Sequence, residues 1–328
     1  MKAATFDRFG EPAAVLAASD VPAPQPGPGQ IRLRMLASPI NPSDLMTVRG
    51  VYGFKPSLPA IPGFEGTGIV EAAGSGLLGR FLVGKRVAAV SASGGLWAEY
   101  AIIEARKAIP VGKSLADEQA AGFFVNPATA YTMTRSVLKV PAGAWLVQSA
   151  AGSAVGKMVI ALGRRYGFRT LNLVRRRAQA EELRGEGADS IATEEPDWEG
   201  RAAGILGPTG AGFALDPVGG AVGTAMLRML GRNGRFLTYG SLSFEDVAFE
   251  PRRLITQGIS VATFALARHM EGLGLPAKLG LVRTLGKLVA KGTLAQKVGA
   301  TFPLDRIADA ARAAEEPGRD GKVILKIA

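Results

Sequence analysis

Apolar and polar positions alternate in short runs along the first third of the chain, and glycine and proline separate the runs. Between Gln30 and Ser38, Arg32 and Arg34 alternate with apolar residues, which predicts a half-buried strand. Further runs that predict strands follow at short spacing: GTGIVEAAGSG, GKRVAAVSASGG and WAEYAIIEA. Several short strands with turn residues between them indicate a small β-barrel or sandwich.

The pattern changes near Leu115. The run SLADEQAAGFF predicts a helix capped by Ser114, with Asp117 and Glu118 at its positive N-terminus. Helical stretches then alternate with apolar runs that predict strands: AWLVQSA, TLNLV, SIAT, FALDPVG, RFLTYGS and ISVATFAL. Continuous apolar strands between helices are typical of a parallel sheet that is buried on both faces. The fold class is therefore α/β, with a doubly wound parallel sheet beside the β domain.

The last part of the chain predicts an amphipathic helix around Leu279 to Leu288 and a terminal strand, KVILKIA. This stretch is too small to fold alone, so we expect it to pack on the first domain. The expected organisation is residues 1–122 with 267–328 as the β domain, and residues 123–266 as the nucleotide-binding α/β domain. A length of 328 residues agrees with two domains.

Composition narrows the possible chemistry. The chain has no cysteine and one histidine, which excludes disulfides, thiolate nucleophiles and Cys/His zinc sites. Hydroxyls, carboxylates, Lys, Arg, Tyr and an organic cofactor remain. The longest uncharged run, between Lys139 and Lys157, is interrupted by Pro141 and glycines, so no membrane segment is expected. Charged residues near the start argue against a secretion signal, and we expect a cytoplasmic protein.

The net charge of +11 suits an anionic partner such as nucleic acid, an acidic carrier protein or a phosphorylated ligand. The basic residues are spread along the chain, and no basic arm interleaved with aromatic residues occurs. The pattern therefore does not favour nucleic acid.

A glycine-rich turn lies inside AWLVQSAAGSAVGKMVIALGRRYG, which predicts a strand, a turn and a helix. Gly152, Ser153, Ala154, Val155 and Gly156 occupy the turn. At such a turn a backbone can approach a pyrophosphate, and the helix offers free N–H groups. The full G-x-G-x-x-G pattern is absent, so an ordinary tight strand-to-helix turn is the alternative.

Three arginines follow the next predicted strand, which ends at Val174. NAD enzymes usually carry an acidic residue at this place for the ribose 2′-hydroxyl, but this chain has Arg175, Arg176 and Arg177. Arginines would instead bind a 2′-phosphate, which favours NADP over NAD. A solvated basic helix start is the alternative. Gly240 ends a later strand at the edge where open α/β sheets bind ligands.

Several motifs, in order, resemble those of the medium-chain dehydrogenase/reductase superfamily: SPINPSDL, IPGFEGTGIV, NPATAY, AAGSAVG, ALDPVGG and FLTYGS. The resemblance covers nearly the whole chain. It implies a GroES-like β-barrel domain and a Rossmann domain. Zinc-binding members carry Gly-His-Glu where this chain reads Gly63-Phe64-Glu65, so the resemblance is to the zinc-independent branch.

Within that branch, the segment NPSDLMTVRGVYGFKPSLPAIPGFEG resembles the 2-enoyl thioester reductases. The resemblance implies that Tyr52 is the proton donor or orienter and that Asn41 lines the cleft and contacts the cofactor. It places Asn126 and Thr129, in NPATAY, beside the nicotinamide, and Tyr239 is a candidate for the same pocket. An aromatic residue packed in a loop is the alternative for Tyr52.

The expected function is NADPH-dependent reduction of the C=C bond of a 2-enoyl thioester, linked to CoA or to a carrier protein. An NADPH quinone oxidoreductase and a non-catalytic NADPH-binding protein are the alternatives. The resemblance also implies a homodimer. Arg49 and Lys55 flank Tyr52 and could contact a CoA or carrier phosphate, although a solvated surface is the simpler interpretation.

Overall fold

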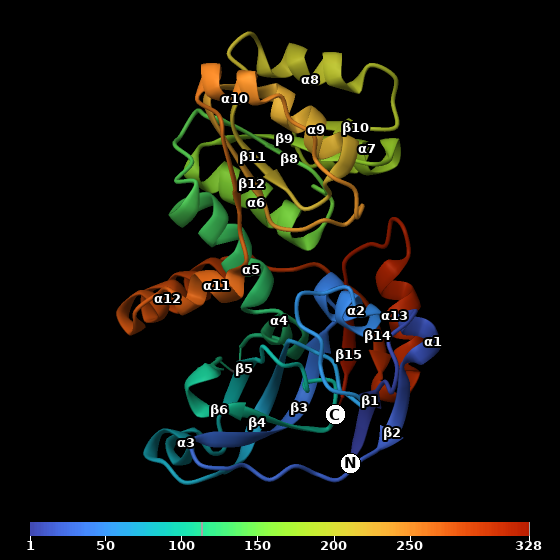
Figure 1. Ribbon diagram of the computed structural model, residues 1–328. Helices are drawn as coiled ribbons and strands as arrows, with labels where there is room; N and C mark the ends of the chain where they lie inside the picture. The colour runs from blue at the N-terminus through green and yellow to red at the C-terminus, as the bar shows by residue number, and fades with distance from the viewer. Residues whose placement is uncertain (113, 328) are drawn as a thin grey trace. The chain divides into compact units, whose positions relative to one another are not determined.

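The computed structural model describes residues 1–112 and 114–327 (Figure 1). The chain forms two compact units. Unit 1 is Met1–Val125 together with the C-terminal stretch from Ala295, and unit 2 is Asn126–Leu294. The first boundary lies close to the one expected from the sequence.

A seven-stranded sheet forms the centre of unit 1. Its order is β14, β15, β3, β4, β5 and β7, with β6 also paired to β3, and its pairs are antiparallel except for β14 with β15. A separate antiparallel pair is formed by β1 and β2. The strands are β1 (Lys2–Thr5), β2 (Ala17–Asp20), β3 (Gln30–Pro39), β4 (Glu65–Ala73), β5 (Arg86–Val90), β6 (Tyr100–Glu104), β7 (Ala108–Pro110), β14 (Val298–Pro303) and β15 (Lys322–Lys326).

Short helices surround this sheet. They are α1 (Pro12–Val15), α2 (Pro42–Arg49), α3 (Leu77–Leu82), η1 (Ala105–Lys107), α4 (Asp117–Ala121), η3 (Leu304–Arg306) and α13 (Ile307–Glu315). Arg49, at the end of α2, donates to Glu315 (2.6 Å) and to Glu11 (2.7 Å). These ion pairs join α2 to α13 and to the start of α1, so Arg49 has a structural role here.

Unit 2 is built on six parallel strands in the order β10, β9, β8, β11, β12, β13. This is the doubly wound order of dinucleotide-binding sheets, in which the strand order reverses beside the first strand, β8. The strands are β8 (Trp145–Gln148), β9 (Arg169–Val174), β10 (Ser190–Ala192), β11 (Ala211–Asp216), β12 (Leu230–Thr238) and β13 (Ser260–Thr263).

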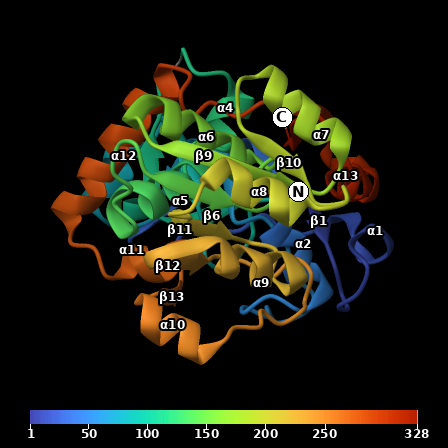
Figure 2. The same ribbon diagram turned by 90° about the horizontal axis from the view of Figure 1, so that it is seen from above.

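Helices cover both faces of this sheet. Figure 2 shows α6 and α7 on one face and α9 on the other. This is why the central strands are mostly apolar: β8 is buried at all four positions. The helices are α5 (Val125–Tyr131), η2 (Thr132–Val137), α6 (Ala154–Tyr166), α7 (Arg177–Gly185), α8 (Trp198–Leu206), α9 (Gly220–Met229), α10 (Pro251–Gln257), α11 (Leu266–Glu271) and α12 (Leu275–Ala290).

Two details differ from the sequence-based expectations. The predicted cap Ser114 is wrong, because α4 begins only at Asp117 and its cap position is Ala116. The sequence pattern places residues from 267 onward with the first domain, whereas the structure groups α11 and α12 with unit 2. Helix α12 has a buried apolar face, formed by Leu281, Leu285, Leu288 and Val289. The chain returns to unit 1 from Ala295 onward, and its strand β15 pairs with β3.

Candidate functional site

The glycine-rich turn joins β8 to α6. Ser153 caps α6, and its Oγ accepts a hydrogen bond from the backbone N–H of Gly156 (3.1 Å). A Cβ on Gly156 would lie 2.5 Å from the carbonyl oxygen of Ala151, so only glycine lets the helix come this close to the turn. Gly152 and Val155 lie in the same turn, and a Cβ on Gly152 would meet the end of the Gln179 side chain at 3.4 Å. The turn thus has the close helix approach of a dinucleotide site.

Two buried amides hold this turn, and the sequence analysis missed both. Gln148 Nε2, at the end of β8, donates to the carbonyl oxygen of Gly156 (3.0 Å) and to Asn172 Oδ1 on β9 (2.8 Å). Both side chains are fully buried. A polar residue inside an otherwise apolar strand was the available signal, because buried amides in a core need hydrogen-bond partners.

The three arginines after β9 have different surroundings. Arg177 begins α7, and its guanidinium lies 3.4 Å from the buried carboxylate of Glu195. Its backbone N–H donates to Glu194 (2.7 Å). Among the described residues, Arg175 and Arg176 have no ion pair, and the buried Nε of Arg176 has no hydrogen-bond partner. Buried donors are normally satisfied, so Arg176 fits an anionic ligand.

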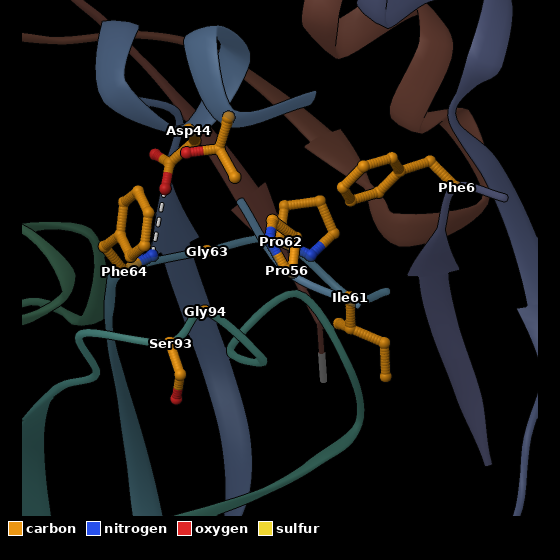
Figure 3. Close-up of a pocket in the computed structure, with 10 residues that line it drawn as sticks. Phe6, Asp44, Pro56, Ile61, Pro62, Gly63, Phe64, Ser93 and Gly94 are labelled. Atoms are coloured by element: carbon orange, nitrogen blue, oxygen red, sulfur yellow. Dashed lines mark hydrogen bonds between the residues drawn. The ribbon is translucent and has the colours of Figure 1, made fainter. Parts of the chain in front are cut away.

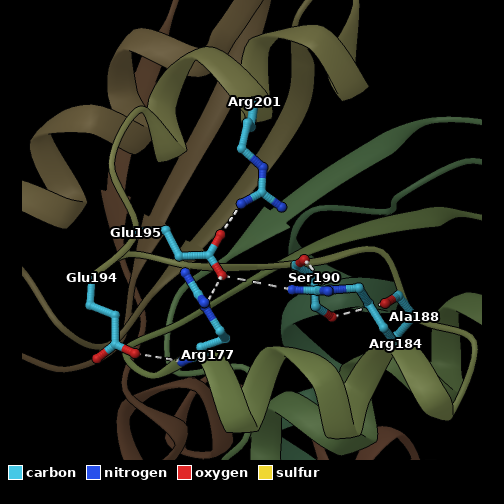
Figure 4. A network of polar contacts seen from close by, with 7 residues as sticks. All are labelled: Arg177, Arg184, Ala188, Ser190, Glu194, Glu195 and Arg201. Atoms are coloured by element: carbon cyan, nitrogen blue, oxygen red, sulfur yellow. Dashed lines mark hydrogen bonds and ion pairs between the residues drawn. The ribbon is translucent and has the colours of Figure 1, made fainter.

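Figure 4 shows how Glu195 is held. Its carboxylate also binds Arg201, on α8, and lies 4.0 Å from Arg184, on α7. Three guanidinium groups therefore surround one buried carboxylate. This arrangement fixes the start of α7 and occupies Arg177, which leaves Arg175 and Arg176 as the pair that could bind a phosphate.

The ends of β11 and β12 are ordered by Asp216. Its carboxylate accepts hydrogen bonds from Ser149 Oγ, from Val218 N (2.9 Å) and from Gly219 N (3.0 Å). Tyr239 N donates to the carbonyl oxygen of Asp216 (3.0 Å), and a Cβ on the next residue, Gly240, would lie 2.9 Å from the carbonyl oxygen of Pro217. Tyr239 and Gly240 thus follow β12 at the carboxyl edge of the sheet, as predicted.

The predicted nicotinamide-side residues of unit 2 lie on α5. Asn126 and Thr129 are both buried, each with 8% exposure. The Nδ2 of Asn126 has no hydrogen-bond partner within the described part of the chain. A buried amide donor without a partner fits a carbonyl or amide group of a ligand. Together with the Gly156 approach and the Arg176 donor, it makes unit 2 suitable for NADP(H).

In unit 1, Asn41 lies at the centre of a buried polar cluster. Its Nδ2 donates to Glu65 Oε1 (2.8 Å), and its Oδ1 accepts from Lys322 Nζ. Asp44 accepts from the backbone N–H groups of Asn41 (2.7 Å) and Phe64 (2.9 Å). Both polar groups of the Asn41 amide therefore have partners in the protein, and its contact with the cofactor stays a prediction.

Burial dominates the electrostatics of this cluster. It raises the pKa of the Asp44 and Glu65 carboxyls and lowers the pKa of Lys322, because each charged form loses its hydration. The charge of Lys322 opposes the shift of both carboxyls, and the two carboxylates oppose the shift of Lys322, whereas the charge of Glu65 further raises the pKa of Asp44.

Tyr52 follows α2 in a loop. Its backbone N–H donates to the carbonyl oxygen of Met46 (3.2 Å), and its ring centroid lies 5.6 Å from that of Phe64. The side chain is 39% exposed. Burial, followed by the charge of Asp44, raises the pKa of the phenol. The hydroxyl is thus protonated at neutral pH and can donate a proton or a hydrogen bond.

Phe64 is positioned by Gly63, which has φ +99°. A Cβ at Gly63 would lie 2.4 Å from the fully buried ring of Trp97. Figure 3 shows the small pocket beside it, with Asp44 reaching the Phe64 N–H from α2. The pocket has room for about one water molecule, so it is too small to hold a substrate.

No cluster of three or more His, Cys, Asp or Glu side chains suited to a metal ion occurs among the described residues. In the same part of the chain, no helix is long and apolar enough to cross a bilayer.

Comparison with known proteins identifies the family. Residues 27–113 match the model of the alcohol dehydrogenase GroES-like domain, and residues 187–325 match that of zinc-binding dehydrogenases. The chain is 31% identical to the human mitochondrial enoyl-[acyl-carrier-protein] reductase, over 99% of this chain and 88% of that protein. The chain belongs to the medium-chain dehydrogenase/reductase superfamily. The predicted GroES-like and Rossmann domains are therefore confirmed.

Solved structures of this superfamily have the same fold. A Bacillus thuringiensis protein provisionally described as an NADPH:quinone reductase has a TM-score of 0.92 and 31% identity, covering 100% of this chain and 99% of its own. A mycobacterial member solved in complex with NADPH has a TM-score of 0.89 and 27% identity, covering 100% of both chains. Both the enoyl thioester and the quinone reductases are thus among the similar proteins.

Proposed function

We propose that this medium-chain reductase uses NADPH to reduce the C=C bond of 2-enoyl thioesters. The observation that carries the proposal is the identity of 31% with a human enoyl-[acyl-carrier-protein] reductase over 99% of the chain. The presence of Tyr52 in the segment that resembles the enoyl reductases supports the same substrate class. The NADPH complex of the mycobacterial relative supports the cofactor.

The residues of unit 2 would hold the cofactor. Arg175 and Arg176 would bind its 2′-phosphate, the turn from Gly152 to Gly156 its pyrophosphate, and Asn126 and Thr129 its nicotinamide end. When bound, NADPH supplies the hydride that adds to Cβ of the enoyl group.

Tyr52 would act on the thioester group of the substrate. Its phenol would donate a hydrogen bond to the thioester oxygen, stabilise the charge that develops there, and deliver or orient the proton that reaches Cα. The raised pKa keeps this proton on the oxygen at neutral pH. Asn41, fixed by Glu65 and Lys322, would keep the neighbouring helix α2 in place.

We further propose that the reaction needs no zinc. The chain has no cysteine, and Phe64 stands where zinc-binding members of the superfamily carry histidine. A phenol donor can replace the Lewis acid, because it polarises the same carbonyl oxygen. Equal activity after treatment with a zinc chelator is the expected result.

The Bacillus thuringiensis neighbour favours one alternative, an NADPH quinone reductase. A substrate panel separates the two functions: NADPH oxidation is followed with trans-2-enoyl-CoA substrates of several chain lengths and, separately, with quinones. The proposal expects the highest kcat/KM for an enoyl thioester. Turnover of quinones alone would overturn it, and NADPH binding without any turnover would indicate a non-catalytic protein.

We also infer that the protein forms a homodimer through β13. This strand pairs only with β12 in the described sheet, and all four of its residues are exposed. A free edge strand can pair with a second copy. Light scattering of the purified protein tests the dimer.

The cytoplasmic location of the protein stays a prediction, since the human relative is mitochondrial.

A further inference from the structure

A row of large exposed side chains runs along helix α12. Leu275, Leu279, Arg283, Lys287 and Lys291 follow each other at four-residue spacing, from the first residue of the helix to its C-cap. At 1.5 Å per residue the row is about 24 Å long. The two leucines are 68% and 48% exposed, and the three cations are exposed as well. The buried residues of α12, such as Leu285, lie on the opposite side of the helix.

The three cations of this row have no acidic neighbour. No Asp or Glu occurs between Glu271 and Asp305, and among the described residues the side chains of Arg283, Lys287 and Lys291 form no ion pair. Like charges four residues apart destabilise a helix. The helix dipole offsets this repulsion, because it favours cations near the helix C-terminus, but no ion pair among the described residues neutralises the positive charge of the three side chains.

Some basic residues elsewhere in the described part of the protein are neutralised by ion pairs. Arg49 is paired with Glu11 and Glu315, and Lys157 with Glu182. Arg201 is paired with Glu195. The α12 row differs from these residues because three cations without an ion pair follow each other on one ridge, directly after two exposed leucines. This arrangement indicates a surface that meets an anionic partner.

The arrangement of the row favours a protein over a bilayer. An interfacial helix places apolar residues along its whole length, so that one face enters the lipid. Here the apolar side chains occupy the N-terminal part of one ridge, and the cationic side chains occupy its C-terminal part. Ridges of four-residue spacing are the surfaces that pack against another helix. The fitting partner is a helix with acidic residues at one end and apolar residues at the other.

We propose that the α12 row, Leu275 to Lys291, docks an acidic acyl-carrier protein that delivers the enoyl group. This inference rests on the proposed function, because it names the carrier of that substrate. The long orange helix of Figure 1 is the surface concerned. Charge attraction would speed the encounter and set the orientation, and the leucines would add apolar contact.

Binding to trans-2-decenoyl-acyl-carrier protein, immobilised on a sensor, tests the proposal with the full chain. The test variant carries Arg283→Glu, Lys287→Glu and Lys291→Glu. The control carries Arg165→Glu, Arg232→Glu and Arg252→Glu, which are exposed arginines of unit 2 outside α12 and give the same change of net charge. A second variant with glutamine at the three row positions covers the case in which charge reversal unfolds the helix. Thermal melting and NADPH affinity check that each variant is folded.

We expect the row variant to bind the loaded carrier at least tenfold more weakly, the glutamine variant to lie between, and the control to stay within threefold of the native protein. KM should rise for the carrier-linked substrate and stay within twofold for trans-2-decenoyl-CoA. Equal weakening in the row and control variants would overturn the proposal. An equal rise in KM for the CoA substrate would also overturn it. Binding to vesicles of four parts phosphatidylcholine to one part phosphatidylglycerol is measured as well. If the row substitutions weaken binding to these vesicles and leave binding to the carrier unchanged, the proposal is wrong. Row-dependent carrier binding without reduction of either thioester would support the docking surface and reject the proposed function.

Discussion

Lys322 Nζ on β15 donates a hydrogen bond to Asn41 Oδ1 at the start of α2, although the two residues are 281 positions apart. Both side chains are buried, and Glu65 Oε1 accepts from the other end of the same amide. The last strand of the chain therefore fixes the helix that precedes Tyr52. Buried charge of this kind is costly unless each group keeps its partners.

Replacing this lysine should destabilise unit 1. Lys322→Met leaves Asn41 Oδ1 without its donor and removes a cation near the buried carboxylates of Asp44 and Glu65. We expect a loss of about 3 kcal/mol in the free energy of unfolding, measured by urea denaturation. The control Lys326→Met removes an exposed pair with Glu118 and should cost less than about 1 kcal/mol. Equal losses in the two variants would contradict the role of Lys322.

The glycine-rich turn gives a second prediction. Gly156→Ala puts a Cβ 2.5 Å from the carbonyl oxygen of Ala151, so the turn and α6 have to separate. The variant should lose about 1–3 kcal/mol of stability, the usual cost of overpacking, and bind NADPH more weakly. Gly185→Ala in α7 is the control, because nothing lies within 4 Å of its added Cβ. Calorimetry measures both effects, and unchanged NADPH affinity in Gly156→Ala would argue against a pyrophosphate at this turn.

The preference for NADPH over NADH tests the role of Arg175 and Arg176. Arg175→Ala combined with Arg176→Ala should weaken NADPH binding by about 10²-fold, since each lost hydrogen bond to a charged group is worth roughly 1.5–3 kcal/mol. NADH binding should change little, because NADH lacks the 2′-phosphate. Arg177→Ala is the matched control, since this side chain already faces Glu195. If NADPH and NADH affinity fall by the same factor, the 2′-phosphate site lies elsewhere.

Tyr52 should determine both the rate and its alkaline limit. Tyr52→Phe is expected to lower kcat/KM for an enoyl thioester by about 10²–10⁴-fold. A proton donor is active while protonated, so activity is lost as the pH rises through its pKa. Burial and the charge of Asp44 raise this pKa above the usual value of a phenol, so the alkaline limb should lie above about pH 10.

The pH profile of Tyr52→Phe supplies the control, because the alkaline limb should disappear in this variant. A rate loss below threefold, or a limb that persists in Tyr52→Phe, would remove this residue from the mechanism.

Local pattern was sufficient for much of the fold. The alternation around Arg32 and Arg34 matches β3, in which every second residue from Ile31 is buried. The apolar run before Gly152 matches β8, and the helix after it begins at Ala154. These elements could be predicted because each is decided by the periodicity of its own residues.

Contacts between distant segments could not be predicted in this way. Nothing near Asn41 in the sequence indicates its hydrogen bond with Lys322. Likewise, nothing near Arg177 indicates its ion pair with Glu195. The boundary after α12 also depends on long-range burial of its apolar face. The motifs located the candidate site, whereas its supporting partners became visible only in the fold.

The most direct test of the proposed reaction follows the hydride itself. NADPH carrying deuterium at the transferable C4 position is incubated with a trans-2-enoyl thioester, and the acyl product is analysed by mass spectrometry and NMR. We predict a saturated acyl chain one mass unit heavier, with the deuterium at C3. An enoyl substrate recovered unreduced and unlabelled while deuterated NADPH is consumed by a quinone would contradict the account.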